Sequence, residues 1–273
     1  MGLKEGVFAD RVAVITGASS GLGAALAVAF VQAGAAVAIF GRNGEKLDEV
    51  AGECRRAGGE GTAVVGDVTR PEDCRRLVET AVAEWGRVDY LVANAGLSMW
   101  APFEEIEDLE LFRRLIEVNY LGALHCAHFG LPHLKESRGM FVAVSSIQGK
   151  IGVPLHTGYV ASKHALQGFC DTLRLELDGS GVEVLTVMPH WLRGTNLRQN
   201  AFGRDGQPLG PSSRKHSSES IPMEVACQAI LTAVHKRRRQ LVIPWKLRLL
   251  LAVNFIRAQW AEALIKGAVN KQD

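Results

Sequence analysis

Short apolar runs recur along the chain, and longer stretches with the hydrophobic spacing of helices separate them. A strand that is buried on both faces reads as a continuous apolar run, so each short run predicts a strand of a parallel sheet. The longer stretches predict helices that connect these strands by crossovers. The sequence therefore predicts an α/β fold, a doubly wound parallel sheet with helices on both faces. The predicted strands are 12–15, 37–40, 63–65, 90–92, 140–144, 182–187 and 241–243, and the predicted helices include 24–31, 44–56, 71–85 and 162–177.

The segment from Gly21 to Gly41 is long and apolar enough to suggest a membrane span, because Gln32 is its only polar side chain. It consists mostly of Ala and Gly instead of Leu or Ile, and Gly34 interrupts it. We therefore predict a buried helix followed by a buried strand at 36–40, and no span.

Composition narrows the class of protein. The 273 residues include 31 Lys and Arg and 29 Asp and Glu, a net charge of +2 that disfavours binding to nucleic acid through phosphate contacts. With 47% hydrophobic residues the chain can bury a sizeable core. Five widely spaced cysteines without a CxxC pair argue against a disulfide framework or a zinc site. The first ten residues lack the apolar segment of a signal peptide, so we expect a cytoplasmic protein.

A glycine-rich turn, Thr16-Gly17-Ala18-Ser19-Ser20-Gly21-Leu22-Gly23, follows the first predicted strand and opens into a helix. Glycines let the backbone approach a pyrophosphate, whose charge then lies at the positive end of the helix. The spacing differs from the G-x-G-x-x-G fingerprint, and a tight strand-to-helix corner is the alternative interpretation.

Three further residues have the chemistry for proton transfer. Tyr159 and Lys163 lie four residues apart, so on a helix they share one face. A nearby ammonium group would lower the tyrosine pKa from its ordinary value near ~10. Ser146 follows the strand 140–144, where a doubly wound sheet presents ligand groups, and Ser145 is its immediate competitor.

The order and spacing of a set of motifs over roughly residues 9 to 195 resemble those of the short-chain dehydrogenase/reductase family. The matching residues are the glycine-rich turn, Asp67-Val68, Asn94-Ala95-Gly96, Asn119, Ser146, Tyr159 and Lys163. The resemblance implies a Rossmann fold and an oxidoreductase that transfers a hydride between a nicotinamide coenzyme and a ketone or secondary alcohol. It also implies that Asn119, Ser146, Tyr159 and Lys163 are catalytic, with Ser146 favoured over Ser145 and Asn119 holding a water that links Lys163 to solvent. The coenzyme contacts it implies are Gly17, Ser19, Ser20, Gly21, Leu22, Gly23, Asp67, Val68, Asn94, Ala95, Gly96, Tyr159, Lys163, Pro189 and Thr195.

The end of the second predicted strand indicates which coenzyme is used. An acidic residue there would bind the ribose hydroxyl of NAD, whereas a basic one would accept the phosphate of NADP. The chain has Phe40-Gly41-Arg42-Asn43, so Arg42 predicts NADP(H). A solvated cation at a helix start is the alternative interpretation of Arg42.

One motif departs from the family pattern. The family usually has Pro-Gly after the sixth strand, but here His190 follows Pro189, and Thr195 lies one position later than usual. Contacts to the nicotinamide carboxamide are therefore in doubt, although Gly194 can supply the flexibility that position 190 lost. His190 and Trp191 could instead wall a bulky apolar substrate pocket.

Residues 190–220 are rich in Gly, Pro and Ser and predict a substrate lid, but this composition does not identify the substrate. We expect a single domain over 1–273 that acts on a lipophilic substrate, which is steroid-like, retinoid-like or a keto ester. The resemblance implies a homodimer or homotetramer through helices near 105–133 and 157–178. The basic run 236–239 and an amphipathic tail over about 245–268 would either cover the cleft or a neighbouring subunit, or contact a membrane peripherally. A membrane-associated scaffold with little turnover is therefore the alternative function.

Overall fold

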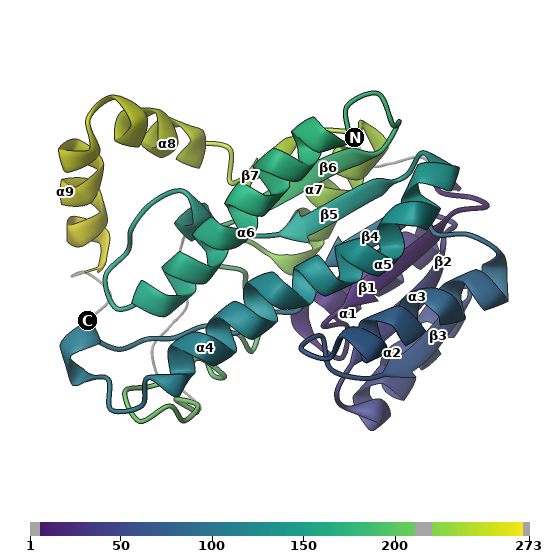
Figure 1. Ribbon diagram of the computed structural model, residues 1–273, viewed down its shortest axis with the longest axis horizontal. Helices are drawn as coiled ribbons and strands as arrows, with labels where there is room; N and C mark the ends of the chain where they lie inside the picture. The colour runs from purple at the N-terminus through teal and green to yellow at the C-terminus, as the bar shows by residue number, and fades with distance from the viewer. Residues whose placement is uncertain (1–5, 211–219, 270–273) are drawn as a thin grey trace.

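The computed structural model describes residues 6–210 and 220–269, which contain one sheet of seven parallel strands in the order β3-β2-β1-β4-β5-β6-β7 (Figure 1). The predicted doubly wound sheet is confirmed, and every predicted strand agrees with an observed one within two residues at either end. The strands are β1 (Val12–Thr16), β2 (Ala36–Gly41), β3 (Gly61–Val65), β4 (Tyr90–Ala93), β5 (Met140–Val144), β6 (Glu183–Pro189) and β7 (Gln240–Ile243).

Helices cover both faces of the sheet (Figure 1). Residues from α1, α2 and α7 form the apolar core on one face, and residues from α3, α5 and α6 form the core on the other. The helices are α1 (Gly21–Gln32), α2 (Gly44–Arg56), α3 (Pro71–Trp85), α4 (Glu110–Ile116), α5 (Gly122–Ser137), α6 (Thr157–Glu176), α7 (Met223–His235), α8 (Leu247–Ile256) and α9 (Ala258–Val269). Short 3₁₀ turns occur at η1 (Phe103–Glu105) and η3 (Ile147–Gly149), and a π-helical turn, η2 (Glu117–Leu121), joins α4 to α5.

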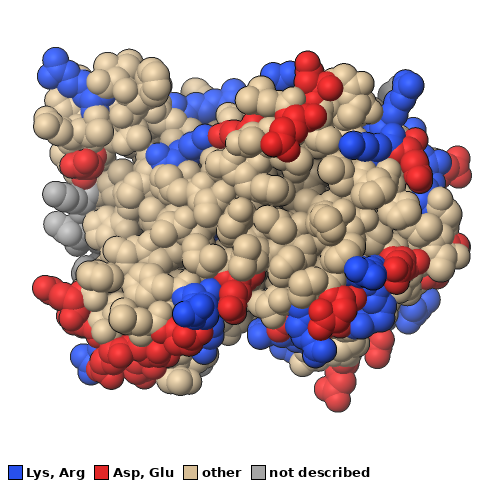
Figure 2. All heavy atoms as spheres, viewed as in Figure 1, with Lys and Arg blue, Asp and Glu red and all other residues tan. Residues whose placement is uncertain are grey.

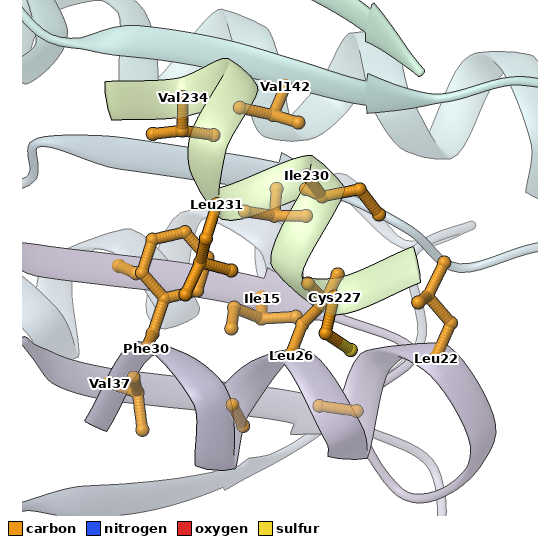
Figure 3. Packing of buried hydrophobic residues seen from close by; sticks show 14 of the residues in the cluster. Ile15, Leu22, Leu26, Phe30, Val37, Val142, Cys227, Ile230, Leu231 and Val234 are labelled. Carbon is orange, nitrogen blue, oxygen red and sulfur yellow. The ribbon is translucent and has the colours of Figure 1, made fainter. Parts of the chain in front are cut away.

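The central strand shows why the chain folds into two cores. All five side chains of β1 are buried, and successive side chains point to opposite faces. Ala13 and Ile15 join the core with α1 and α7, whereas Val12 and Val14 join the core with α3 and α6. In the first of these cores, Leu231 of α7 lies against Phe30 of α1, and Cys227 of α7 lies against Leu26 (Figure 3). The apolar segment 21–41 is thus α1 followed by β2, which confirms the prediction of a buried helix and strand.

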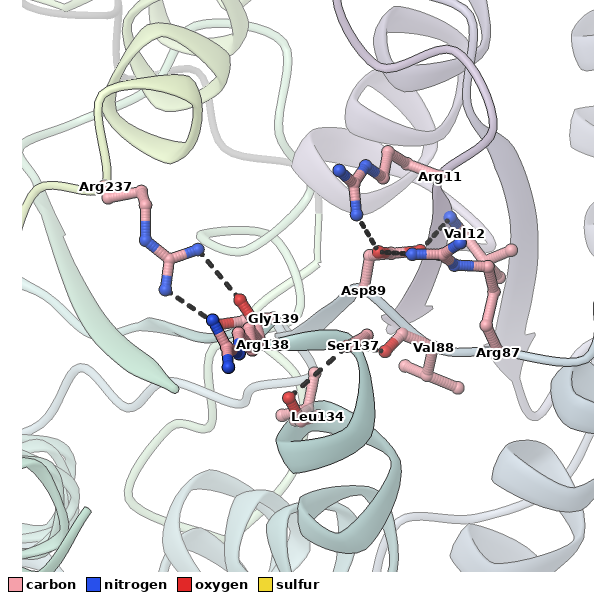
Figure 4. Close-up of polar contacts among 10 residues, drawn as sticks. All are labelled: Arg11, Val12, Arg87, Val88, Asp89, Leu134, Ser137, Arg138, Gly139 and Arg237. Carbon is pink, nitrogen blue, oxygen red and sulfur yellow. Dashed lines mark hydrogen bonds and ion pairs between the residues drawn. The ribbon is translucent and has the colours of Figure 1, made fainter. Parts of the chain in front are cut away.

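The amino-terminal edge of the sheet is fixed by the carboxylate of Asp89, which is 1% exposed (Figure 4). Its Oδ1 accepts hydrogen bonds from Arg11 and Arg87, both at 2.7 Å. Its Oδ2 accepts from Nε of Arg87 at 2.8 Å and from the backbone N–H of Val12 at 3.0 Å. These bonds tie the starts of β1 and β4 together, so they set the register on which the opposite edge depends.

Two predicted boundaries need correction. Helix α6 begins at Thr157, five residues before the predicted start at Ser162. Ser162 is an interior residue, because its hydroxyl donates to the backbone carbonyl of Tyr159 at 2.7 Å and is thereby satisfied within the helix. Helix α1 begins at Gly21, three residues before the predicted start at Ala24. The helices predicted near 105–133 are α4 and α5, which the π-helical turn joins.

The predicted lid and tail are only partly described. Residues 190–210 form turns and isolated bridges, among them Met99 with Phe202, while 211–219 of the predicted lid lie outside the described residues. The predicted tail 245–268 is two helices, α8 and α9. Within the described residues, no helix combines the length and the hydropathy needed to cross a bilayer.

Candidate active site

A cleft of about 950 Å³ lies at the carboxyl ends of the strands, where the strand order reverses between β1 and β4. Open α/β sheets bind ligands at this switch point. Of the predicted site residues, Asn119 and Gly23 do not line the cleft, and the others do. The fold therefore gathers, in one place, residues from 17 to 195 of the sequence.

The glycine-rich turn requires glycine at defined positions. Gly17 and Gly21 have φ angles of +65° and +57°, in the left-handed region. A Cβ at position 17 would lie 2.8 Å from Cα of Ala95, and one at position 23 would lie 2.6 Å from Nδ2 of Asn94. Gly23 therefore serves close packing beneath the turn, whereas Gly17 and Gly21 border the cleft itself.

The start of α1 provides a site for an anion. Its N-cap residue, Ser20, makes no side-chain capping bond, and the first turn carries no acidic residue. The first N–H groups of a helix have no partner within the helix and carry positive partial charge. With glycine backbone on the approach, these residues fit the pyrophosphate of a dinucleotide.

Asn94 joins the end of β4 to the glycine-rich turn. Its Nδ2 donates to the carbonyl of Thr16 at 2.9 Å, and its backbone N–H donates to Oγ1 of Thr16 at 3.0 Å. Ala95 donates to the same hydroxyl at 3.1 Å. The predicted groove residues Asn94, Ala95 and Gly96 thus line the cleft and also hold the turn in place.

Two cations line the cleft beyond β2. Arg42 lies just beyond the end of β2, is exposed and lines the cleft. Lys46, in the first turn of α2, also lines the cleft and was missed in the sequence analysis. Arg42 precedes the N-cap residue of α2, so helical spacing gave no signal for Lys46. Asn43 caps the helix by accepting from the N–H of Lys46 at 3.0 Å.

Asp67 and Val68 lie at the same end of the cleft. Oδ1 of Asp67 accepts from both the N–H and the hydroxyl of Thr69 at 3.0 Å, so the residue shapes a local turn. It also borders the cleft, which leaves its carboxylate beside the expected place of the adenine.

Tyr159, Ser146 and Lys163 form the centre of the cleft. Ser146 lies close enough to the phenol of Tyr159 to lower its pKa. Lys163 is buried one turn further along α6, and its Nζ donates to the carbonyl of Val144 at 2.9 Å. The Nζ lies 5.8 Å from the centroid of the tyrosine ring. Ser145, the competing serine, has its hydroxyl buried without a hydrogen-bond partner among the described residues.

Burial dominates the protonation of this centre. Burial raises the pKa of Tyr159 to about 12 against the opposing effect of Ser146, and burial lowers the pKa of Lys163 to about 8. We expected the lysine to lower the pKa of the tyrosine, but in the protein alone burial raises it. A positive charge bound beside the phenol, as an oxidised nicotinamide supplies, would favour its ionisation.

Asn119 acts on this centre from the π-helical turn. Its Oδ1 accepts from the N–H of Leu97 at 2.7 Å, and its Nδ2 donates to the hydroxyl of Ser162 at 2.8 Å. Ser162 in turn donates to the carbonyl of Tyr159. These bonds connect the end of β4 to the helix that carries Tyr159; the water that Asn119 is expected to hold stays a prediction.

The departure from the family pattern lies beside the cleft. Pro189, His190 and Thr195 all line it, and Gly194 has a φ of +83° that a residue with a side chain rarely adopts. Thr195 lies next to the glycine-rich turn, since a Cβ at Gly21 would be 3.8 Å from it. The displaced threonine therefore still reaches the coenzyme end of the cleft.

Aromatic side chains form the other end of the cleft. The ring centroid of Trp100 lies 4.9 Å from that of His156 and 5.7 Å from that of Trp191, and the guanidinium of Arg198 lies 4.8 Å from it. Phe202 closes this end and packs against Arg114. Sequence reasoning found Trp191 but missed Trp100 and His156, because isolated residues between predicted elements give no periodic signal.

The fold and this site are those of a dinucleotide-binding α/β protein. The sequence profile described as short chain dehydrogenase matches residues 11–205, and the chain belongs to that family. It is 36% identical over 198 residues to 11-beta-hydroxysteroid dehydrogenase 1A of Arabidopsis thaliana, covering 72% of this chain and 56% of the plant protein. It is also 36% identical over 241 residues to dehydrogenase/reductase SDR family member 7B of Bos taurus, covering 86% of this chain and 73% of the bovine protein.

A solved structure with a similar fold is an alcohol dehydrogenase from the archaeon Thermococcus sibiricus complexed with 5-hydroxy-NADP. Its TM-score is 0.73 at 28% identity, and the match covers 85% of this chain and 95% of the archaeal one. The chain spans 56% to 62% of the length of the plant hydroxysteroid dehydrogenases of Arabidopsis thaliana that it matches.

Proposed function

We propose that the protein is an NADP(H)-dependent oxidoreductase that interconverts a lipophilic ketone and the corresponding secondary alcohol. The observation that carries this proposal is the buried pair of Tyr159 and Lys163, with Ser146 beside the phenol, in a cleft that begins at the glycine-rich turn. In this proposal residues 1–273 act as one dinucleotide-binding and catalytic domain.

The coenzyme would supply or accept the hydride. The residues of the chain handle the proton and the oxygen: Tyr159 donates its phenolic proton to the oxygen of the ketone during reduction, and takes it back during oxidation. Ser146 holds the same oxygen by a hydrogen bond. The positive charge of Lys163 would stabilise the phenolate of Tyr159. One N–H of its ammonium group donates to Val144, so two N–H donors are left to bind the ribose of the coenzyme.

The preference for NADP(H) rests on Arg42 and Lys46. Both line the cleft at the end of β2, and no carboxylate occupies that corner of the sequence. Two cations there favour the additional phosphate of NADP, which the ribose hydroxyl of NAD lacks. The NADP analogue in the archaeal relative is consistent with this choice.

The preference for a lipophilic substrate rests on the aromatic end of the cleft. Trp191 and Phe202 offer apolar ring faces to the cleft, as ligand pockets for apolar molecules usually do, and Trp100 packs against Trp191. The names of the plant relatives are those of hydroxysteroid dehydrogenases, which are consistent with such a substrate.

A panel of ketones tests the proposal. Purified protein is mixed with NADPH and a steroid ketone, retinaldehyde or a β-keto ester, and loss of NADPH absorbance is followed. We expect at least one of them to be reduced, with NADPH used in preference to NADH. Tight NADPH binding without turnover of any carbonyl compound would favour the alternative function, a scaffold that keeps the fold.

We propose a homodimer or homotetramer through α4, α5 and α6. Figure 2 shows few charged side chains in the middle of the face formed by these helices. The exposed residues of α6 there are small or uncharged and recur at helical spacing: Ala161, His164, Gly168, Thr172 and Leu175. Light scattering should give a dimer or larger, and Gly168→Glu should shift it toward monomer; a monomeric wild type would refute this.

A peripheral membrane contact is a second candidate, and α8 with α9 favours it. Leu247 and Leu251 pack toward the core near Ile147, yet the opposite side leaves Phe255 and Trp260 exposed. The basic run 236–239 does not act as one membrane-binding cluster in this proposal. Its Arg237 donates to the backbone carbonyls of residues 138, 139 and 181, which precede β5 and β6 (Figure 4).

Co-sedimentation with vesicles of phosphatidylcholine and phosphatidylglycerol tests the contact. Interfacial binding buries exposed apolar side chains and draws Arg248 and Arg257 to anionic lipid. We expect binding to the mixed vesicles, and its loss in a Phe255→Ser, Trp260→Ser variant. Equal sedimentation of wild type and variant would remove this candidate.

A further inference from the structure

His156 occupies an unusual place for a histidine. It is the N-cap residue of α6, three residues before Tyr159, and is 3% exposed. Its ring centroid lies 6.4 Å from that of Tyr159 and 6.2 Å from that of Trp191, with Trp100 closer still. The residue lines the cleft at the junction between its reacting centre and its aromatic end.

The hydrogen bonding of His156 defines its tautomer. Nδ1 lies 2.7 Å from the carbonyl oxygen of Pro154, and a carbonyl can only accept, so Nδ1 carries the proton. Burial, aided by the charge of Arg198, lowers the pKa of His156 and keeps the ring neutral. The other nitrogen, Nε2, is therefore an acceptor with a free lone pair.

Nε2 of His156 has no hydrogen-bond partner among the described residues and is closed off from solvent. A buried polar atom without a partner costs about 1 to 3 kcal/mol, so folded proteins rarely retain one without a use. Five side-chain atoms of this kind occur in the described part of the chain, and four of their residues line the cleft: Arg114, Ser145, Gln148 and His156. The unpaired polar atoms are thus concentrated where a ligand would bind.

Gln148 provides a second such group beside the reacting centre. It lies in η3, two residues after Ser146, and its backbone N–H donates to the hydroxyl of Ser146 at 3.2 Å. Its Oε1 is buried and without a partner among the described residues. A carboxamide can turn, so Gln148 can accept from or donate to a hydroxyl, whereas neutral His156 can only accept through Nε2.

We propose that Nε2 of His156 accepts a hydrogen bond from a hydroxyl group of the substrate, so that the preferred substrate is an apolar ketone with a hydroxyl on a carbon near the carbonyl. The proposal rests on the oxidoreductase function given above and specifies its substrate class as hydroxyketones and the diols they yield. Trp191, which lines the cleft beside His156, holds the apolar part, and its ring shifts to let the hydroxyl reach Nε2. A site built to bind a hydroxyl discriminates strongly against the analogue that lacks it, because its buried acceptor then stays unpaired.

Three related ketones test this preference: acetophenone, α-hydroxyacetophenone and β-hydroxypropiophenone. For wild type we expect kcat/KM to be at least ~10-fold higher for one hydroxyketone than for acetophenone. His156→Phe keeps a ring but removes the acceptor. It should reduce the ratio of kcat/KM for the hydroxyketone to kcat/KM for acetophenone by ~10 to 100-fold, and a loss of activity common to all three ketones does not affect this ratio. His156→Gln, which retains an acceptor, should restore part of the ratio.

His164→Phe is the matched control, because His164 is on the same helix, is exposed, and also has Nδ1 2.9 Å from a backbone carbonyl. It should leave the ratio unchanged. An equal loss for all three ketones in His156→Phe would mean that His156 only positions Tyr159 and would overturn the proposal. So would an unchanged ratio.

A binding measurement separates this proposal from the proposed function. Tyr159→Phe protein and Tyr159→Phe, His156→Phe protein are saturated with NADPH and titrated calorimetrically with α-hydroxyacetophenone, β-hydroxypropiophenone and acetophenone. A preference for a hydroxyketone that disappears with His156 supports the inference even if wild type turns over none of the ketones. No preference for a hydroxyketone in the Tyr159→Phe protein would overturn the inference and leave the oxidoreductase function standing if turnover is observed.

Discussion

Removal of the cations Arg42 and Lys46, which lie beyond β2, should weaken the binding of NADPH. Arg42→Ala and Lys46→Ala each remove a cation from the cleft without touching the core, because both side chains are exposed. A hydrogen bond to a charged group contributes about 1.5 to 3 kcal/mol, and exposure places each of these cations at the lower end. We therefore expect each variant to weaken NADPH by ~10-fold, and the double variant by less than ~100-fold because both cations contact one phosphate.

Fluorescence titration with NADPH and NADH measures the difference directly. NADH lacks the phosphate, so its dissociation constant should change by less than about twofold in either variant. The NADPH loss should also shrink at high salt, since exposed charges are screened. Arg56→Ala, at the far end of α2, is the control and should bind both coenzymes as wild type does. Equal losses for NADPH and NADH, or a wild-type preference for NADH, would refute the assignment of this corner to the phosphate.

Three other changes have defined outcomes. Lys163→Met should abolish turnover yet stabilise the fold by up to roughly 3 kcal/mol at about pH 7, because burial lowers the lysine pKa from 10.5 to about 8 and one pKa unit is about 1.4 kcal/mol. Between about pH 8 and 10.5 Lys163 is protonated in the unfolded state but not in the folded state, so the stability of wild type rises with pH. In urea unfolding, the difference in stability between Lys163→Met and wild type should therefore shrink over that range. Asp89→Ala should lower the free energy of unfolding by about 1 to 3 kcal/mol, since it leaves the buried N–H of Val12 without a partner, whereas the half-exposed arginines can turn to water; no measurable loss in urea would contradict this. Gly17→Ala should abolish coenzyme binding in the same fluorescence titration, because its Cβ would meet the backbone of Ala95; retained affinity would show that the turn can adjust.

The sheet could be predicted from the sequence because its strands are buried on both faces. Runs such as 140–144 contain no polar residue, whereas a half-exposed helix has polar residues on its exposed side. The observed β5 has the same bounds as this predicted strand. The start of α6 could not be predicted in this way. Ser162 resembles an N-cap residue by type, and only the backbone carbonyl that it meets shows it to be interior.

Some residues of the candidate site could be predicted from the sequence and others could not. Ser146, Tyr159 and Lys163 belong to an ordered set of motifs, so their sequence positions alone indicated that they would meet. His156 and Trp100 carry no such pattern, and their proximity depends on how the loop after β4 folds against the start of α6. The protonation of Tyr159 was also beyond the sequence, because the depth of burial decides its pKa.

The central claim is that Tyr159 supplies the proton for carbonyl reduction, and Tyr159→Phe tests it most directly. The variant removes one hydroxyl and keeps the ring. Turnover of a reducible ketone with NADPH should fall by ~10² to 10⁴-fold, the usual contribution of general acid catalysis, while the NADPH dissociation constant stays within about twofold. Residual turnover within about threefold of wild type would contradict the account.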